Sequence, residues 1–598
     1  MKKLAYIFAI ILLITSRALS ATYYIDYEAG DDSNAGTTTG APFQHLPYDA
    51  RFTGSCTPAA GDNFYFNRGT TYSATSALTT YMFESITSGS AGSPITFGAY
   101  GTGTDPIIEG GFAIDESQFA LYSGVAGTNA VYRATNSSLG TTGITVISAY
   151  EFDSFDTTET NISHAYVSQG STSGLTAVCT LYQSGTAAGD YVYIRTSDNN
   201  TPVGMDIHLF WVQYGFHSTG HTFVFENLRM FGFYKYIIYM SGSGSYNGYN
   251  IDVQNCDFGY TEQAIESSYG AVYSANNRFH YCWMDKEISS DSYDEAGGAA
   301  NVGASDDTDS LFEDTEIIGY ENGLTLVEIL SSFTMRRCFV MDAVTTETAA
   351  DSSLREAEHF IRLSGTAVMG DPVYVYRTIF YNASHDLLYD NHCNGLEGDC
   401  NADFRLFNCT IYEDRGGNWP ERGVLSWGFT TDWPAYCKNN IFVNRIPWQN
   451  YNYTPVTIGW TVVDADYNYY VTDNTGDYSA GPIDDGVDRL DYTLSEWQSA
   501  LSTNSALSSE ANSSWEDYSS GVVAALFQST TYGDTDFLKP KVGGNLINAG
   551  VEITTGENET DYDGNAVVGA YDIGAIEDQT PTVLPRFKIG NVFKWVFE

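Results

Sequence analysis

A strand-like run of about seven residues recurs along the middle of this chain, and its spacing limits the folds that the chain can adopt. Eight copies follow one another in the regular stretch 222–471. When the copies are aligned, one column carries mostly cysteine or small polar residues, at Leu228, Cys256, Asn277, Thr315, Cys338, Thr378, Cys409 and Asn440. Successive members lie between 21 and 40 residues apart, so a constant unit is lengthened by insertions of different size. Self-similarity at this period indicates a repeat architecture.

The repeated runs favour a parallel β-helix. Helical repeats would place apolar residues at i, i+3 and i+4, whereas these runs carry apolar and β-branched strand patterns. A single coil cannot bury its own apolar side, so neighbouring coils must stack into a continuous core. Small residues at one repeated position fit an internal ladder, in which like side chains stack about 4.8 Å apart. A β-propeller is the main rival, but its blades need four strands of more regular length.

Phrases at both ends of the chain carry a family resemblance. The opening ones are Tyr23-Tyr-Ile-Asp26, Gly61-Asp-Asn-Phe-Tyr-Phe66 and Pro106-Ile-Ile-Glu-Gly110, and the closing ones are Asp561-Tyr-Asp-Gly564 and Tyr571-Asp-Ile-Gly-Ala-Ile-Glu577. They resemble the entry and exit segments of bacterial secreted right-handed parallel β-helix proteins, the pectin-lyase-like superfamily. One departure is visible, because Val567 or Val568 stands where related closing segments often carry an arginine. The resemblance implies an all-β, right-handed parallel β-helix. It leaves the function open, because that superfamily holds lyases, hydrolases, epimerases, tailspikes and adhesins.

The chain divides into a few expected parts. Residues 1–20 combine two lysines, an apolar run and a small-residue cleavage site, which predicts a secretory signal peptide. Residues 21–577 form one expected β-helix domain, with a lateral β-rich insertion at 112–221 and the regular coils at 222–471. The basic, aromatic tail 578–598 is expected to cover the open end of the helix or to act as a sorting signal. We therefore expect a protein that is secreted, periplasmic or on the cell surface, without a membrane span.

The charge of the chain restricts its partners. There are 74 acidic residues against 27 lysines and arginines, for a net charge of −47. Such a charge excludes nucleic acid as a partner and repels polyanions at long range. The sequence does not determine the oligomeric state.

The cysteines fall into two groups. Cys256, Cys338 and Cys409 lie on the ladder column and are expected to face inward as small apolar residues. Cys393 and Cys400 share one short segment, where an exported protein could form a disulfide or keep two free thiols.

Polar residues after the aligned runs are the candidates for chemistry. Period-two alternation is expected to turn five of them outward on neighbouring coils, where they would share one groove. These are Glu266, Arg362, Asp386, Asp390 and one of Lys286 or Glu287.

Two reactions fit such a group. In β-elimination from a uronic acid polymer, a base removes a proton next to a carboxylate that a cation neutralises. The candidates for base and acid are Lys286, Arg362, His359 and His385, and the candidate Ca²⁺ ligands are Glu266, Glu287, Asp386 and Asp390. The acidic stretch 291–309 is another candidate for Ca²⁺ binding, or a disordered insertion. In hydrolysis, Glu266, Glu328, Asp386 and Asp390 could serve instead as paired carboxylates.

Aromatic residues in the later connections offer flat faces for sugar rings. These are Trp419, Trp433, Trp448 and Tyr451, which could equally pack down over the coils as covers. The sequence therefore predicts a protein that binds a polysaccharide and cleaves it, with a Ca²⁺-assisted lyase ahead of a glycoside hydrolase. The non-enzymatic alternative is a tailspike-like glycan-binding protein.

Overall fold

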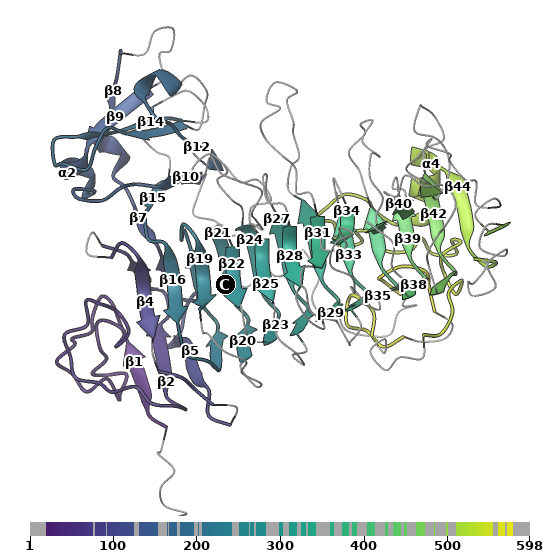
Figure 1. Cartoon of the computed structure of the whole chain (residues 1–598), viewed down its shortest axis with the longest axis horizontal. Coiled ribbons are helices and arrows are strands. Elements are labelled where there is room, and N and C mark those ends of the chain that lie inside the picture. Colours follow the sequence, from purple (N-terminus) through teal and green to yellow (C-terminus); the bar gives the residue numbers. More distant parts are fainter. Residues whose placement is uncertain are drawn as a thin grey trace, which may run out of the picture.

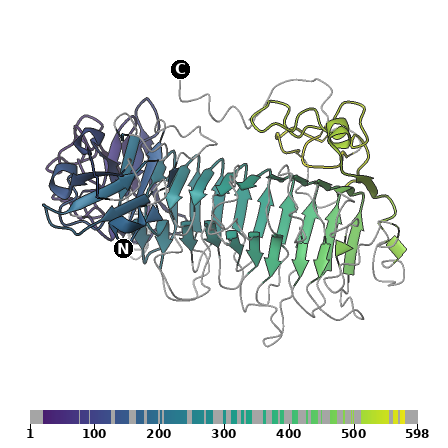
Figure 2. The same ribbon diagram turned by 90° about the horizontal axis from the view of Figure 1, so that it is seen from above.

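The computed structural model of the chain is a parallel β-helix built from three long sheets (Figures 1 and 2). The structure describes residues 20–577, apart from short stretches before residue 240, most of the segments that connect strands between 242 and 509, and residues 554–559 and 568–570. All neighbouring strands of the three sheets run parallel. The predicted fold class is confirmed. No helix among the described residues is long and apolar enough to cross a membrane.

Each coil passes through the three sheets in a fixed order, which we number sheet 1, sheet 2 and sheet 3. Sheet 1 contains β1 (Thr22–Ile25), β2 (Asn63–Asn67), β5 (Ile95–Tyr100), β17 (Phe223–Glu226), β20 (Asn250–Gln254), β23 (Ala271–Ala275), β26 (Ser310–Glu313), β29 (Phe333–Arg336), β32 (Val373–Tyr376), β35 (Phe404–Phe407), β38 (Pro434–Lys438) and β41 (Val462–Asp466).

Sheet 2 contains β3 (Thr71–Ser73), β6 (Ile107–Glu109), β18 (Arg229–Phe231), β21 (Asp257–Thr261), β24 (Arg278–Cys282), β27 (Glu316–Gly319), β30 (Phe339–Asp342), β33 (Ile379–Tyr381), β36 (Thr410–Tyr412), β39 (Ile441–Val443), β42 (Tyr469–Thr472) and β44 (Ser514–Asp517). Sheet 3 contains β4 (Tyr81–Ser85), β16 (Tyr214–Ser218), β19 (Tyr236–Met240), β22 (Gln263–Ser267), β25 (Gly298–Val302), β28 (Thr325–Ile329), β31 (His359–Leu363), β34 (Asp386–Asp390), β37 (Leu425–Trp427), β40 (Trp448–Asn450) and β43 (Ile483–Asp484).

A lateral insertion leaves the second coil after β6 and returns before β16. It consists of two small sheets, which lie at the N-terminal end of the row of coils (Figure 2). One holds β7 (Gly111–Ala113), β10 (Ser148–Phe152), β11 (His164–Ala165) and β15 (Asp206–Phe210), and the other holds β8 (Ala120–Leu121), β9 (Val131–Thr135), β12 (Val167–Ser168), β13 (Thr180–Gln183) and β14 (Tyr191–Arg195). Short helices η1 (Glu116–Gln118), α2 (Asn136–Leu139) and η2 (Thr172–Gly174) accompany them. Because β16 pairs with β4 and β19, residues 214–218 belong to the coils, although the sequence assigned them to the insertion.

The repeated seven-residue run is two strands with a corner between them, rather than one strand. In the first copy, β17 of sheet 1 ends at Glu226 and β18 of sheet 2 begins at Arg229. Asn227 between them has a φ of 57°, in the left-handed region that asparagine and aspartate tolerate better than most residues. The same conformation recurs at each corner, at Asn255, Asn276, Asp314, Arg337, Arg377, Asn408, Asn439 and Tyr467.

The aligned column follows each left-handed residue and forms an internal ladder. Its eight members are at most 3% exposed, including the three cysteines predicted to face inward. Side chains of one coil bond to the backbone of the previous one, as where Asn440 Oδ1 accepts from Cys409 N at 2.9 Å and its Nδ2 donates to Leu406 O at 2.9 Å. The ladder therefore satisfies backbone groups that the corner removes from the sheets.

Replacing Asn440 by alanine should destabilise the coils around it. The substitution leaves the Cys409 N–H and the Leu406 carbonyl without these partners in a site that is 0% exposed. Each unsatisfied group costs about 1–3 kcal/mol, so we expect a lower melting temperature and faster hydrogen exchange at the Cys409 amide. Asn512→Ala is the control, because Asn512 bonds Asp466 in an exposed position. Unchanged exchange at Cys409 would contradict the ladder's role.

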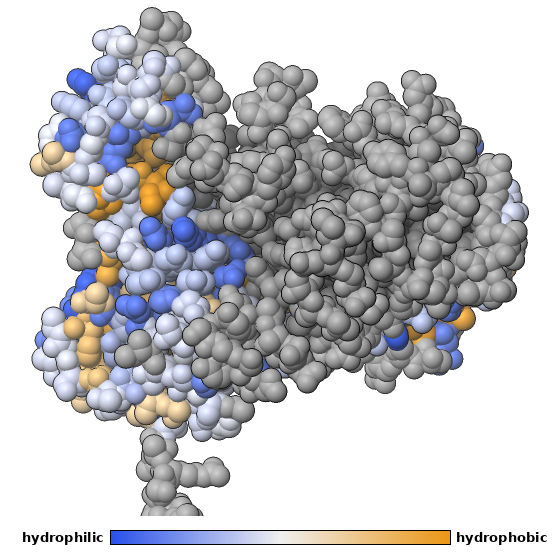
Figure 3. Space-filling model, in the orientation of Figure 1, coloured by the Kyte–Doolittle hydropathy of each residue, from blue (hydrophilic) through white to orange (hydrophobic). Residues whose placement is uncertain are grey.

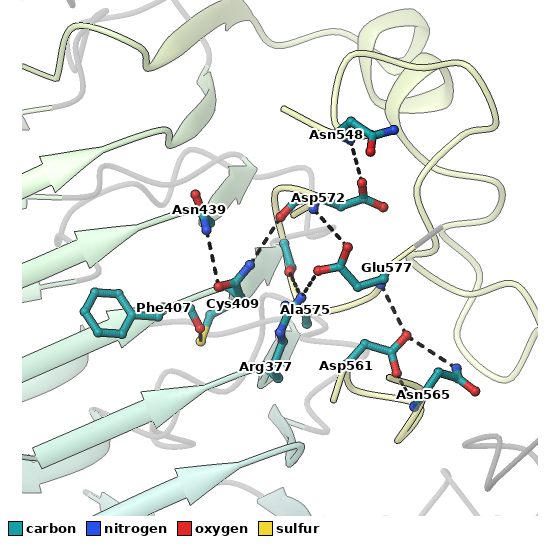
Figure 4. Close-up of polar contacts among 12 residues, drawn as sticks. Arg377, Phe407, Cys409, Asn439, Asn548, Asp561, Asn565, Asp572, Ala575 and Glu577 are labelled. Carbon is teal, nitrogen blue, oxygen red and sulfur yellow. Dashed lines mark hydrogen bonds and ion pairs between the residues drawn. The ribbon is translucent and has the colours of Figure 1, made fainter. Parts of the chain in front are cut away.

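The closing segment 546–577 runs back along the corners between sheets 1 and 2 (Figures 2 and 4). It follows α4 (Ser520–Leu526) and contacts the corners of several earlier coils. Val551 exchanges hydrogen bonds with Asn439, Asp572 O accepts from Asn408 Nδ2, and Glu577 pairs with Arg377.

Arg377 and Glu577 form a buried ion pair within this contact. Arg377 Nη1 lies 2.5 Å from Glu577 Oε1, and their side chains are 1% and 3% exposed. The other oxygen of Glu577 accepts from Asp572 N at 2.9 Å. The phrases that carried the family resemblance at the C-terminal end therefore fasten a segment onto corners of much earlier coils.

Candidate functional site

The outer face of sheet 3 gathers polar and aromatic side chains on neighbouring coils. Its first strands show two outward positions separated by two consecutive buried residues, as in β19, where Ile237 and Ile238 are 0% exposed and lie between Tyr236 and Tyr239. The same spacing holds in β4, with Tyr81 and Glu84 on either side of Met82 and Phe83. Residues that pair with one another across neighbouring strands form a column along the axis of the β-helix. Sheet 3 therefore presents two outward columns, which lie three residues apart along each strand.

One outward column begins with Glu84, His217, Tyr239 and Glu266. Its register continues through Asn301, Glu328, Arg362, Tyr389, Ser426, Gln449 and Asp484. The other column begins with the partly exposed Tyr81, Tyr214 and Tyr236 and continues through Gln263, which is only 3% exposed. Its register includes Gly298 and, further along, Thr325, His359 and Asp386. Neighbours in a column stand about 4.8 Å apart, the spacing between paired strands.

Five rings of the first three strands form a continuous stack across both columns. Tyr81 stacks on His217 with centroids 4.4 Å apart, and His217 lies 5.2 Å from Tyr239. Tyr214 contacts Tyr239 at 5.2 Å, and Tyr236 contacts Tyr239 at 5.0 Å. The four tyrosines are partly exposed, and the surface over these coils is mainly hydrophilic (Figure 3). Flat amphipathic rings beside carboxylates and amides are the groups that contact sugars.

The predicted residues His359, Arg362 and Asp386 come together on two neighbouring strands. Arg362 stands between Glu328 and Tyr389 in one column, and His359 stands between Thr325 and Asp386 in the other. Glu266 lies in the same column as Arg362, three strands away, and its side chain is partly exposed as predicted. The register thus brings a histidine, an arginine and carboxylates of the prediction onto one stretch of sheet 3.

Two predicted residues, Asp390 and Trp448, lie outside the two outward columns. Asp390 pairs with Leu363, in the column that contains Ile329, Val302 and Ser267, which is 2% exposed. Trp448 pairs with Leu425, in the column that leads back to Ile361 and the buried Ile265. For Asp390 the cause is the pair of consecutive buried positions in sheet 3 strands, which strict alternation does not allow for. Trp448 was expected in a connection, whereas it begins strand β40. Tyr389, expected to face inward, takes the outward register instead of Asp390.

The remaining predicted residues lie outside the described part of the chain. They precede or follow strands of sheet 3 in the sequence, and are Lys286, Glu287, His385, Trp419, Trp433 and Tyr451. The acidic stretch 291–309, the pair Cys393 and Cys400, the signal peptide and the tail 578–598 also fall mainly or wholly outside it.

Two of the predicted Ca²⁺ ligands, Glu266 and Asp386, lie on distant strands of sheet 3. Glu266 in β22 and Asp386 in β34 are four strands apart, about 19 Å along the axis, which exceeds the reach of one ion's ligands. Among the described residues no three His, Cys, Asp or Glu side chains are grouped to hold a metal. Calcium binding at 291–309 stays a prediction, which loss of activity or of melting temperature on chelation would support.

A second polar cluster lies on the outer face of sheet 2 but is closed to substrates. Arg229, Asp257, Arg278 and Glu316 occupy one column of successive strands, with side chains 6–18% exposed. Burial raises the pKa values of Asp257 and Glu316 and lowers that of His280, which is 1% exposed. Asp257 lies 3.1 Å from His280 and 3.7 Å from Arg229, and Tyr532 of the C-terminal part donates to Glu316 at 3.0 Å. These charges are compensated within a packed interface.

The residues that sequence reasoning missed come from β4 and β16. Tyr214 and His217 were not considered because 214–218 was assigned to the lateral insertion, and Glu84 was not considered because it precedes the regular coils at 222–471. The available signal was the match of Tyr-Gly-Phe-His at 214–217 with Tyr-Ile-Ile-Tyr at 236–239, which have aromatic residues at the same two positions.

Comparisons with known proteins add the following. No family model matches this chain, and no curated protein matches it. Among solved structures it is similar to pectate lyase Pel9A, with 13% identity, 95% of this chain and 98% of that chain covered, and a TM-score of 0.43. It is also similar to a rhamnogalacturonan lyase, with 12% identity, 88% of this chain and 97% of that chain covered, and a TM-score of 0.41. A glycoside hydrolase matches with 10% identity, 76% of this chain and 94% of that chain covered, and a TM-score of 0.41. At these scores the similarities do not assign a function.

Proposed function

We propose that this protein binds an extended polysaccharide along the outer face of sheet 3 and cleaves it at strands β28, β31 and β34. The observation that carries the proposal is the register of this face. The ring stack of the first coils and the His359, Arg362 and Glu328 positions belong to the same two columns of neighbouring strands. A linear polymer is the kind of ligand that matches such a repeating surface.

The connections of the coils support sheet 3 as the binding face. The corner from sheet 1 to sheet 2 is always two residues long in the regular coils, as between Gln254 and Asp257. By contrast, the segments that precede and follow sheet 3 strands reach lengths of about 15 residues, as between Cys282 and Gly298. Long connections are where β-helices and other scaffolds carry variable binding residues. The predicted Trp419 and Trp433 belong to such segments.

β-Elimination is the reaction that fits the residues of β31. In that reaction the guanidinium of Arg362 pairs with the carboxylate of a uronic acid and stabilises the negative charge that develops beside it. His359 acts as the base and removes the proton next to the carboxylate. The glycosidic oxygen then leaves and takes a proton, which gives a new unsaturated end. Asp386 pairs with His359 in the backbone register, and in this proposal its carboxylate orients the imidazole.

Hydrolysis is the second candidate, and one spacing favours it. Glu266 and Glu328 lie in one column two strands apart, about 10 Å between backbones. Inverting glycosidases hold their two carboxyl groups about 6.5–9.5 Å apart, with a water between. The net charge of −47 also suits a neutral glycan better than a polyanion.

A panel of neutral and uronic-acid polysaccharides tests the proposal. Absorbance of unsaturated uronates, together with new reducing ends, would show elimination, and reducing ends without that absorbance would show hydrolysis. Binding without either signal would leave a glycan-binding protein. Neither cleavage nor binding on the panel would overturn the assignment of this face.

Replacing Tyr236 by alanine should weaken glycan binding without unfolding the protein. Tyr236 is partly exposed at the edge of the ring stack and contacts Tyr214 and Tyr239. Loss of one stacking face is worth about 0.5–1.5 kcal/mol, so we expect an increase in Kd of up to about tenfold. Tyr236→Phe should keep most of the affinity. Tyr374→Ala, which removes a ring from the outer face of sheet 1, is the matched control, and an equal effect there would contradict the location of the site.

A further inference from the structure

A serine, a histidine and a glutamate meet on three successive strands of sheet 3. Ser241, directly after β19, has its Oγ 2.7 Å from His217 Nε2 in β16. On the opposite side of the imidazole, Nδ1 lies 3.7 Å from Glu84 Oε1 in β4. With a proton on Nδ1 facing Glu84, Nε2 accepts the hydroxyl hydrogen of Ser241. This is the order of nucleophile, base and orienting carboxylate that covalent hydrolases use.

The surroundings hold the imidazole in this position. Its ring lies between Tyr81, at 4.4 Å and 14°, and Tyr239, at 5.2 Å and 28°, and these stacked rings restrict tilting of the imidazole out of its plane. The His217 side chain is 10% exposed, whereas the Glu84 side chain is 54% exposed and Ser241 is partly exposed. Within the described part of the chain, His217 Nδ1 has no hydrogen-bond partner. A small shift of the Glu84 side chain brings its carboxylate within hydrogen-bond distance of Nδ1. Such contacts are often long before substrate binds.

We propose that Ser241, His217 and Glu84 form a catalytic triad that hydrolyses ester substituents on sugars held by the tyrosine stack. The choice of a sugar ester as substrate rests on the proposed function, but the triad itself does not. Arg362 lies four strands from β19, about 19 Å along the axis, so the two reactions would act on different parts of one bound chain.

The reaction needs only ester and water. Ser241 Oγ attacks the ester carbonyl while its proton passes to His217 Nε2, and Glu84 stabilises the imidazolium through Nδ1–H. Collapse of the tetrahedral intermediate breaks the bond to the sugar oxygen, which takes the proton from His217 and leaves as the free hydroxyl. Water then adds to the acyl-serine, with His217 as base, and releases the carboxylic acid and Ser241.

The protonation of His217 agrees with the role of a base. Burial lowers the pKa of His217 below its usual value of 6.5, and the nearby Glu84 only partly opposes this effect. The groups that face the ring are Tyr81 and Glu84 from β4, Tyr214 from its own strand, and Tyr239 and Ser241 from β19. His217 is therefore neutral at pH 7, and esterase activity should fall only when the pH drops below the ordinary imidazole range.

The test is ester hydrolysis by the whole protein, measured on 4-nitrophenyl acetate and as acetate released from acetylated oligosaccharides. We expect Ser241→Ala and His217→Gln to lower kcat/KM on the order of 10³-fold, and Glu84→Gln to lower it less because the carboxylate only orients the base. Ser33→Ala, at an exposed serine, should have no effect. A fluorophosphonate should label the wild type and the Ser33 variant, but not the Ser241 variant.

Two results would overturn the triad. One is a folded wild type that releases no acetate and takes no label, and the other is undiminished hydrolysis by Ser241→Ala. The Arg362→Ala variant separates this inference from the proposed function, because it should lose depolymerisation and keep esterase activity. Esterase activity on 4-nitrophenyl acetate without any glycan cleavage would keep the triad and reject the proposed function.

Discussion

Replacing Arg362 by alanine is expected to remove polysaccharide cleavage while leaving the fold intact. The proposed role of this guanidinium is to neutralise a substrate carboxylate whose charge grows as the adjacent proton leaves. Removing one such stabilising group typically lowers kcat on the order of 10²–10³-fold, or about 3–4 kcal/mol. Initial rates of unsaturated product formation measure the loss. The rate of Arg362→Lys should lie between those of the wild type and of Arg362→Ala, because lysine keeps the charge but not the bidentate geometry.

The matched control is Arg405→Ala. Arg405 also belongs to a strand of the coils, but its guanidinium lies over Tyr374 and Tyr436 on sheet 1, at 5.0 and 4.9 Å from the ring centroids. Cleavage by that variant should match the wild type. Full activity of Arg362→Ala would remove Arg362 from the site. If reducing ends without unsaturation are the product, Glu328→Gln should take the large loss instead.

Replacing Glu577 by alanine is expected to cause the largest loss of stability among these variants. The substitution leaves the guanidinium of Arg377, which is 1% exposed, without its ion-pair partner. Removing one member of a buried ion pair costs about 3–5 kcal/mol. We expect a lower melting temperature and release of the closing segment, seen as new protease cleavage within 546–577.

Two further variants test whether the loss of stability comes from the buried charge of Arg377. Glu313→Ala removes a partner of Arg336 on the outer face of sheet 1, where the side chains are 23–26% exposed, and should cost no more than about 1 kcal/mol. Arg377→Met combined with Glu577→Leu removes both charges and should recover much of the loss. Protease resistance of Glu577→Ala equal to that of Glu313→Ala would show that the closing segment is held by its other contacts.

The sequence was sufficient to predict the coils because the ladder repeats a chemical requirement. Most corners place an asparagine or aspartate in the left-handed conformation, followed by a small or hydrogen-bonding residue inside, as Asn255-Cys256 and Asn439-Asn440 show. The corner itself was not predicted. A seven-residue run with apolar residues on both sides of an asparagine is also compatible with one long strand, since alternation does not reveal a turn between sheets.

The candidate site was predicted only in part, for two physical reasons. Alternation correctly separated Glu266 from Ile265, but it failed in β34, where the outward register passes from Asp386 to Tyr389 rather than Asp390. The second reason is distance along the chain. Glu84, His217 and Ser241 become neighbours only when three coils stack around an insertion of about a hundred residues, so no local motif relates them.

The late position of the closing segment in the chain also has a consequence for synthesis. Asn439 leaves the ribosome 112 residues before Val551, and Arg377 leaves it 200 residues before Glu577. Coils can stack one by one as they emerge, because each needs only the one before it. The contacts of the closing segment with these corners, however, can form only after Val551 to Glu577 have been made. Synthesis of the closing segment, rather than addition of the final coil, thus completes the packing of the corners.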